Sequence, residues 1–215
     1  MSTPYAYSTA FASNRAKSQD ASGVYERGDV LVVVLADGGG GMRGGEAASR
    51  SLVAVVESAV NDSTFQLERV QPWIDLFRAT DVGLVANGAG ETTGVVIVVG
   101  PWGILGMSIG DSEAWVVTPQ GVDNLTVGQY TRQRLGTRRA AVVIFERSAL
   151  SGVLVVATDG LFKYAATDVI AGIVRDGSLA EVPERLVELV RLRSGKVADD
   201  VAVVLVQRKL PQTVC

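Results

Sequence analysis

The 215-residue sequence contains no histidine and a single cysteine, Cys215, at its last position. The absence of histidine excludes histidine acid–base catalysis and histidine metal ligands. A single cysteine cannot form an internal disulfide. No apolar run reaches transmembrane length, and residues 1–20 lack the apolar segment of a signal peptide. We therefore expect a cytoplasmic protein that makes no membrane contact.

Aromatic residues are also few, at 6%, and neither sign of charge dominates, since the net charge is only -3. This charge gives no general attraction to nucleic acid. The only loose basic cluster is typical of a solvated loop rather than of a binding patch. With 47% hydrophobic residues the chain can bury one large core, so we expect a single domain over residues 1–215. The basic cluster consists of Arg132, Arg134, Arg138 and Arg139.

Short apolar runs rich in β-branched residues predict strands. Glycine, proline or aspartate bounds these runs, and several are almost continuously apolar, as in strands that are buried on both faces. Tight turns join the runs between residues 94 and 118, which requires those strands to be antiparallel. The predicted strands are residues 30–36, 94–99, 103–109, 113–118, 141–146, 153–158 and 201–207.

Apolar residues at helical spacing predict helices before and after this run of strands. Pro72 is a point at which the second helix would kink or split, Thr167 is a candidate N-cap, and Pro183 fits a first helical turn. Helices, then strands, then helices again is an α+β order rather than strict βαβ alternation. The predicted helices are residues 46–60, 64–86, 167–175 and 181–193.

A glycine-rich loop from Gly39 to Gly44 fits the pattern G-x-G-x-x-G between a predicted strand and a predicted helix. That pattern is typical of dinucleotide-binding domains, which need a second parallel strand after the helix. Here a second helix follows instead. The sequence therefore favours a loop in which glycines permit close backbone approach.

Aspartates stand at the ends of four predicted strands, each beside a glycine or a second aspartate, and a fifth lies in a polar lead-in. One such residue alone is most often a turn or cap aspartate. Several carboxylates that converge on one rim repel each other unless a cation lies between them, which indicates a site for divalent ions. The strand-end aspartates are Asp37, Asp111, Asp159 and Asp199, and the fifth is Asp20.

Asp37 is the natural bridge between two ions because it leaves a buried strand directly into glycines. At Gly38 there is no side chain, so the backbone carbonyl could itself reach an ion. Mg²⁺ and Mn²⁺ both prefer carboxylate, carbonyl and water oxygens. Two such ions about 4 Å apart can activate a water and clamp a phosphoryl group.

The residues around these aspartates form motifs that follow one another in a fixed order. Together they resemble the metal-dependent serine/threonine protein phosphatases of the type 2C family, in its compact bacterial form, over essentially the whole chain. The motifs are R-x-x-x-Q-D from Arg15 to Asp20, A-D-G-x-G-G-x-x-x-G-E-x-A-S from Ala36 to Ser49, G-x-T-T from Gly90 to Thr93, G-D-S from Gly110 to Ser112, T-D-G-L from Thr158 to Leu161, and D-D-x-x-V-V from Asp199 to Val204.

The resemblance implies a four-layer α-β-β-α sandwich of two mainly antiparallel sheets flanked by helices, with the metal ions at one end. Two Mg²⁺ or Mn²⁺ ions, or three, would activate a water that attacks phosphorus directly. In this resemblance Asp37 would bridge two ions, and Asp159 and Asp199 would complete the ligands of the first ion. Asp20 and the Gly38 carbonyl would bind the second ion, and Asp111 would bind a third. Arg15 would bind the substrate phosphate.

The sequence departs from the family pattern at several points. Gly39 stands where eukaryotic members have a histidine, and Ser18, Gln19 and Ala202 replace the usual residues of their motifs. Residues 119–135 are shorter than the family's mobile flap, so we expect a truncated flap and an open, shallow site.

The implied substrates are phosphoserine and phosphothreonine in target proteins of a bacterial kinase, and we expect a monomer. The alternative is a non-catalytic pseudophosphatase that binds a phosphoprotein or scaffolds a signalling complex. The shortened flap favours this alternative. The intact Asp37, Asp159 and Asp199 disfavour it, because unpaired charges are costly to keep together.

Overall fold

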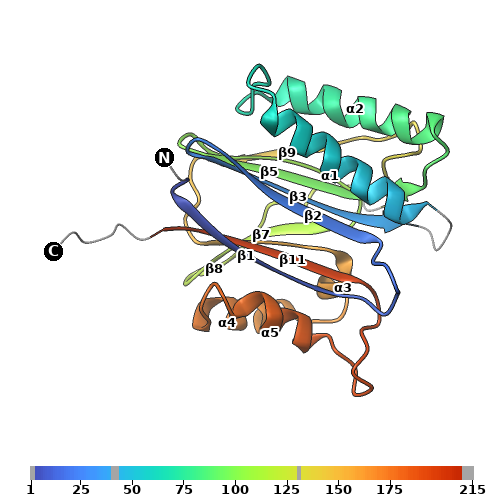
Figure 1. Cartoon of the computed structure of the whole chain (residues 1–215). Helices are drawn as coiled ribbons and strands as arrows, with labels where there is room; N and C mark the ends of the chain where they lie inside the picture. Colours follow the sequence, from blue (N-terminus) through green and yellow to red (C-terminus); the bar gives the residue numbers. More distant parts are fainter. Residues whose placement is uncertain (1–2, 40–43, 130–131, 210–215) are drawn as a thin grey trace.

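Two antiparallel sheets pack face to face in the computed structural model, which describes residues 3–39, 44–129 and 132–209 (Figure 1). The first sheet has the strand order β1-β11-β10-β7-β8. Every strand pair in it is antiparallel. Its strands are β1 (Tyr5–Ala12), β7 (Glu113–Thr118), β8 (Gly121–Asn124), β10 (Val153–Ala157) and β11 (Val201–Arg208).

The second sheet has the order β2-β3-β5-β6-β9, with the short β4 paired to β3, and is also antiparallel throughout. The pairing of β2 with β3 sets Asp20 opposite Asp37. The strands are β2 (Asp20–Arg27), β3 (Val30–Gly39), β4 (Glu91–Thr92), β5 (Gly94–Gly100), β6 (Gly103–Ile109) and β9 (Val143–Arg147).

Helices cover the outer face of each sheet. The pair α1 (Gly45–Asn61) and α2 (Val70–Ala86) lies over the second sheet, and the pair α4 (Thr167–Asp176) and α5 (Val182–Leu189) lies over the first (Figure 1). The single-turn α3 (Asp159–Phe162) follows β10 directly. These four layers confirm the predicted α-β-β-α sandwich.

Three apolar cores separate the layers, and the alternation of side chains along each central strand explains how one strand serves two of them. In β3, Val32 and Val34 face the α1–α2 layer, while Leu31, Val33 and Leu35 face the other sheet. In β11 the same alternation divides the residues between the inter-sheet core and the α4–α5 layer. Because successive side chains of a strand point to opposite faces, continuous apolar runs suit strands covered on both sides.

The structure corrects several boundaries. The helix predicted for residues 64–86 begins only at Val70, so Pro72 lies in its first turn and does not split it. Ala166, rather than Thr167, is the N-cap residue of α4, without a side-chain cap. The fourth predicted helix, residues 181–193, spans only Val182–Leu189.

Four strands were not predicted: β1, β2, β4 and β8. Strands β1 and β2 are edge strands with mixed polar and apolar residues, and their burial alternates or is partial. The short β4 and β8 carry too few residues for a periodic signal. The polar lead-in that holds Asp20 is therefore the start of a strand.

The glycine loop of the rejected dinucleotide pattern lies mainly at residues 40–43, outside the described residues. Around it, β3 pairs antiparallel with β2 and β5, and α2 follows α1. The described part of the chain thus lacks the parallel βαβ unit of a dinucleotide-binding domain. Among these same residues, no helix is both long and apolar enough to cross a membrane.

Candidate metal centre

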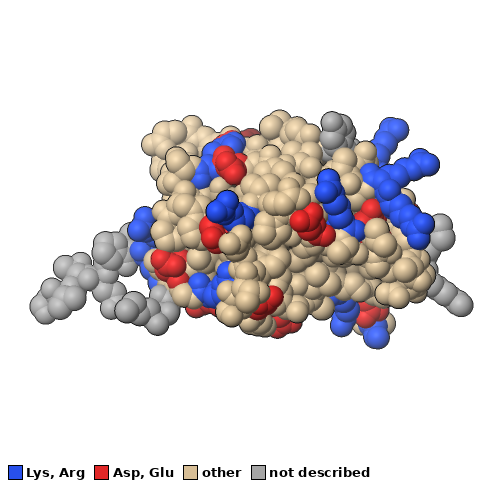
Figure 2. All heavy atoms as spheres, turned by 90° about the horizontal axis from the view of Figure 1, so that it is seen from above, with Lys and Arg blue, Asp and Glu red and all other residues tan. Residues whose placement is uncertain are grey.

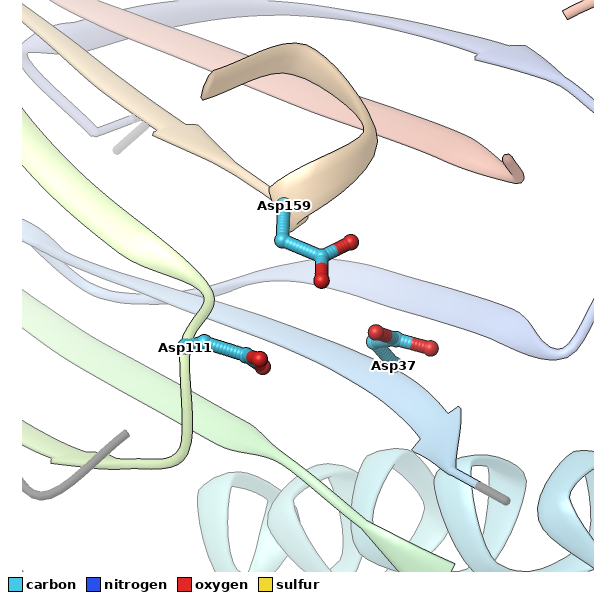
Figure 3. A group of neighbouring side chains, drawn as sticks. All are labelled: Asp37, Asp111 and Asp159. Carbon is cyan, nitrogen blue, oxygen red and sulfur yellow. The ribbon is translucent and has the colours of Figure 1, made fainter. Parts of the chain in front are cut away.

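Three carboxylates converge at one end of the sandwich. Asp37 comes from the end of β3, Asp111 from the β6–β7 turn and Asp159 from the first residue of α3. Each offers an oxygen that lies within 4.8 Å of those of the other two. Figure 3 shows the three side chains pointing toward a common space between the two sheets. Segments far apart in sequence thus build one carboxylate cluster.

Hydroxyl groups of neighbouring motifs hold the backbone of Asp37 in place. The amide of Asp37 donates to the Thr93 hydroxyl at 2.9 Å. Its carbonyl accepts hydrogen bonds from the Thr92 hydroxyl at 3.0 Å and from the Thr93 amide at 2.8 Å. The Thr93 hydroxyl also shares a 2.8 Å hydrogen bond with that of Ser112. The G-x-T-T and G-D-S motifs therefore fix the direction in which Asp37 leaves its strand.

A second set of hydrogen bonds joins the two sheets beside the cluster. The Thr158 hydroxyl donates to Asp20 Oδ2 at 2.8 Å and accepts a hydrogen bond from the Ala202 amide at 3.0 Å. The other oxygen of Asp20, Oδ1, is buried and has no partner among the described atoms. A buried carboxylate oxygen without a donor is costly, so a cation near this oxygen would be stabilising.

Burial and the repulsion between neighbouring carboxylates raise the pKa values of two aspartates of this region. Burial, and then the charge of Asp37, raise the pKa of Asp20 to about 9. Burial, and then the charge of Asp159, raise the pKa of Asp37 to about 6. Both shifts mean that the folded chain disfavours negative charge here without a counter-ion.

The glycine after Asp37 allows an unusually close approach to helix α1. A Cβ atom at Gly38 would lie 2.3 Å from the carbonyl oxygen of Gly45 and 2.9 Å from that of Gln19. The Gly38 amide also donates to the Gln19 carbonyl at 3.0 Å. Any side chain at position 38 would therefore push apart β3, α1 and the start of β2.

Arg15 lies in the β1–β2 connection, which Asp200 holds. The Asp200 carboxylate accepts hydrogen bonds from the Ser13 hydroxyl at 2.6 Å and the Gln19 amide at 2.9 Å. Arg15 Nε is 3.7 Å from Asp200 Oδ2, and about half of the arginine side chain is exposed. Asp200, which is buried, therefore positions the segment that carries both Arg15 and Asp20.

Two further cations contact the cluster. Lys163, one turn after Asp159, forms an ion pair with its carboxylate. That hydrogen bond raises the pKa of Lys163. Arg134 forms an ion pair with Asp111 at 3.4 Å. Even so, the carboxylates at this end of the molecule outnumber the cations that contact them.

The donor set fits hard divalent cations. It consists of carboxylate oxygens, one of which is buried without a partner among the described atoms. Mg²⁺ and Mn²⁺ bind such oxygens, whereas a thiolate-selective metal would lack ligands here. Asp37, Asp111 and Asp159 are the residues best placed to hold an ion.

The structure brings the predicted site residues to the same end but ranks them differently. Asp111, predicted as an accessory ligand, belongs to the three-carboxylate cluster, whereas Asp199 is exposed and outside it. Asp20 adjoins Asp37 across the strand pair. The ligand roles of these aspartates and of the Gly38 carbonyl, and the phosphate role of Arg15, remain predictions.

Several residues of the site were not predicted from the sequence. Thr92, Thr93, Ser112 and Thr158 lie within the quoted motifs, so their position was a signal for a supporting role. Asp200 also lies beside a predicted ligand. No sequence pattern pointed to a role for Arg134 in the site, because the basic cluster to which it belongs is typical of a solvated loop.

Solved structures show what this architecture is similar to. The serine/threonine phosphatase Stp1 from Staphylococcus aureus superposes with a TM-score of 0.79 at 21% identity, covering 94% of this chain and 93% of that one. The Mycobacterium tuberculosis phosphatase PstP/Ppp superposes with a TM-score of 0.78 at 22% identity, covering 98% and 100%. The chain has the fold of the bacterial serine/threonine phosphatases.

This phosphatase fold is also known with metal ions bound. The catalytic domain of PstP in complex with two manganese ions superposes with a TM-score of 0.76 at 23% identity, covering 94% of this chain and 96% of that one. No protein-family model and no curated protein sequence matches the chain.

Proposed function

We propose that the protein is a metal-dependent phosphatase that hydrolyses phosphoserine and phosphothreonine in proteins. The observation that carries this proposal is the convergence of Asp37, Asp111 and Asp159 at one end of a phosphatase fold. The sequence motifs of the type 2C family surround these same residues. The two manganese ions of PstP support a two-ion centre in this chain as well.

The ions, Mg²⁺ or Mn²⁺, would supply an acidified water and a clamp for phosphoryl oxygens. The chain itself supplies the ligands for these ions. Asp37, Asp159 and Asp111 would hold the ions, with Asp199, Asp20 and the Gly38 carbonyl as further ligands. Thr92 and Thr93 keep the Asp37 backbone fixed, so that its carboxylate does not have to reorganise during the reaction.

Arg15 would bind the substrate phosphate. Its guanidinium is half-exposed at the same end of the sandwich, and Asp200 orients its segment. A guanidinium fork suits two phosphate oxygens at once. With no histidine and no internal cysteine in the chain, a covalent intermediate on either side chain is excluded, which agrees with direct attack by water.

The molecule around the site suits a phosphorylated protein substrate. Figure 2 shows Lys and Arg side chains projecting at the end of the molecule where β3 runs into α1 in Figure 1. Positive charge around an acidic centre attracts phosphate groups. We further propose that the protein acts as a single-domain monomer with a truncated flap at residues 119–135, and that it opposes a bacterial protein kinase.

Hydrolysis of a phosphothreonine peptide and of p-nitrophenyl phosphate tests this function. We expect turnover with Mn²⁺, none with EDTA, and a loss of at least about 100-fold in kcat/KM for Asp37→Ala and Asp159→Ala. For Arg15→Ala we expect mainly a raised KM, because phosphate binding is ground-state positioning. Arg50→Ala, an exposed arginine that pairs with Glu46 on α1, is the matched control and should leave both constants unchanged. Metal-independent turnover would disprove the proposal.

A pseudophosphatase is the second candidate, and one observation favours it. Lys163 and Arg134 already neutralise two carboxylates of the cluster. If the protein binds Mn²⁺ but hydrolyses neither substrate, while still binding the phosphopeptide, the pseudophosphatase function is the correct one.

A further inference from the structure

Arg134 is an arginine built into the edge of the carboxylate cluster. Its Nη2 atom lies 3.4 Å from Asp111 Oδ2 and 3.5 Å from Oδ1, so one nitrogen faces both oxygens. Its Cδ and Nε atoms lie 3.0 Å from the point that a Cβ at Gly39 would occupy. The Arg134 side chain thus packs against Gly39, the second residue after Asp37. Its Nε is buried without a partner among the described residues.

The backbone that carries Arg134 is anchored on two sides. Leu135, which is fully buried, exchanges backbone hydrogen bonds with Thr92 at 2.9 and 3.1 Å. The carboxylate of Asp81 on α2 accepts hydrogen bonds from three successive amides, those of Gly136, Thr137 and Arg138. The same Thr92 also contacts the Asp37 carbonyl. The fold therefore fixes the position of Arg134 relative to the cluster.

Arg134 and a divalent ion would compete for one carboxylate. Asp111 belongs to the cluster that would hold the ion, yet its charge is already balanced by a guanidinium. An ion that Asp111 ligates directly would have to approach its oxygens to about 2.1 Å. The guanidinium cannot give up its charge near neutral pH. Two cations on one carboxylate repel each other, so binding the ion requires the ion pair to loosen.

We propose that Arg134 competes with divalent ions for Asp111 and so weakens the binding of the ion that uses this carboxylate. This inference rests on the proposed metal centre and adds to it a residue that sets its affinity. Arg134 forms its ion pair with Asp111 and with neither Asp37 nor Asp159, so the ion that uses Asp111 is the one whose binding it opposes most. The centre would then hold the ion that uses Asp111 less tightly than it would without Arg134.

Isothermal titration calorimetry with Mn²⁺ alone tests the competition without measuring activity. In Arg134→Ala we expect the weakest Mn²⁺ to bind about tenfold more tightly than in the unmodified protein, within the range usual for coupled sites. Asp111→Asn should abolish this gain, so that the double variant binds Mn²⁺ like Asp111→Asn alone. Arg139→Ala removes the same charge from an exposed position of the same segment and should leave the affinity unchanged.

Arg134→Gln, which keeps a hydrogen-bonding side chain but no charge, should reproduce the gain and serves if the alanine variant does not fold. An unchanged affinity in both variants, an equal gain in Arg139→Ala, or a gain that survives Asp111→Asn would each overturn the inference alone. If neither the unmodified protein nor the Arg134 variants bind Mn²⁺, the proposed metal centre is overturned together with the inference.

Discussion

Asp20 shows how strongly one side chain of this site depends on its surroundings. In sequence it is a polar residue before the first apolar run. In the fold it is 7% exposed, faces Asp37 across a strand pair and leaves one oxygen without a donor. Its raised pKa follows from burial first and from the charge of Asp37 second. The metal-free protein therefore retains a proton that an unfolded chain would release.

This retained proton makes the stability of the metal-free protein depend on pH. The pKa of Asp20 is about 9 in the fold against an ordinary value of 3.8. Between these values the folded state binds more protons than the unfolded state, so the free energy of unfolding falls as pH rises. We expect a fall of about 1 kcal/mol per pH unit between pH 5 and 8, measured by urea unfolding in EDTA.

Above about pH 7, where Asp37 with its folded pKa of about 6 no longer holds a proton, the slope should nearly vanish in Asp20→Asn, which keeps the shape but cannot titrate. Asp29→Asn, an exposed acid in the turn between β2 and β3, should retain it. Stability that rises with pH in the unmodified metal-free protein would contradict the burial of an uncompensated carboxylate at Asp20.

At the scale of elements, the connection after β8 depends on one carboxylate of helix α2. Asp81 is 5% exposed, and its Oδ1 atom accepts hydrogen bonds from the amides of Gly136, Thr137 and Arg138 at 2.7, 2.9 and 3.1 Å. A buried carboxylate of this kind replaces regular secondary structure as the partner of the chain. It ties the segment that carries Arg134 to the helix layer.

Removing this anchor should destabilise the protein. We expect Asp81→Ala to lower the free energy of unfolding by about 3 kcal/mol, because three partly buried amides lose their shared carboxylate acceptor. Asp81→Asn, which keeps one acceptor oxygen, should cost about 1 kcal/mol. Both values are measured by urea unfolding of the metal-free protein.

Asp75→Ala is the matched control, since Asp75 lies on the same helix but is 61% exposed. Its effect should stay within about 0.5 kcal/mol. Equal losses for Asp75→Ala and Asp81→Ala would show that the three amides do not depend on Asp81.

At the scale of the whole molecule, the core between the sheets links every layer. Residues of β3, β5 and β6 meet residues of β7, β10 and β11 there, and the reverse faces of β3 and β11 pack on the helices. Neither sheet can lose its partner without exposing this core. The proposed single domain over residues 1–215 thus predicts one cooperative unit.

Calorimetry of the metal-free protein should accordingly give one unfolding transition, with equal calorimetric and van't Hoff enthalpies. Leu154→Ala, at a fully buried position of β10 in the inter-sheet core, should cost about 2–5 kcal/mol and lower the midpoint of that single transition. A variant that unfolds in two steps, one for each sheet, would show that the sheets are separate units.

Much of this architecture could be predicted from the sequence because its signals are local. Apolar runs such as those of β3, β5 and β11 are continuous enough to indicate strands buried on both faces, and tight turns required antiparallel pairing. The edge strands β1 and β2 gave no such signal, since one covered face leaves a weak, mixed pattern. Boundaries such as the start of α2 depend on packing that residues 62–69 do not reveal.

The sequence by itself determined the chemistry available to this protein. It contains no histidine and no internal thiol, and it places aspartates at strand ends, where their carboxylate oxygens are ligands for hard cations such as Mg²⁺ and Mn²⁺. The tertiary structure decided which of these groups meet. It joined Asp111 with Asp37 and Asp159, left Asp199 exposed, buried Asp200 beneath Arg15, and placed Arg134 on Asp111. Distances across the two sheets are set by packing between segments that are far apart along the chain, and no local pattern of residues records them.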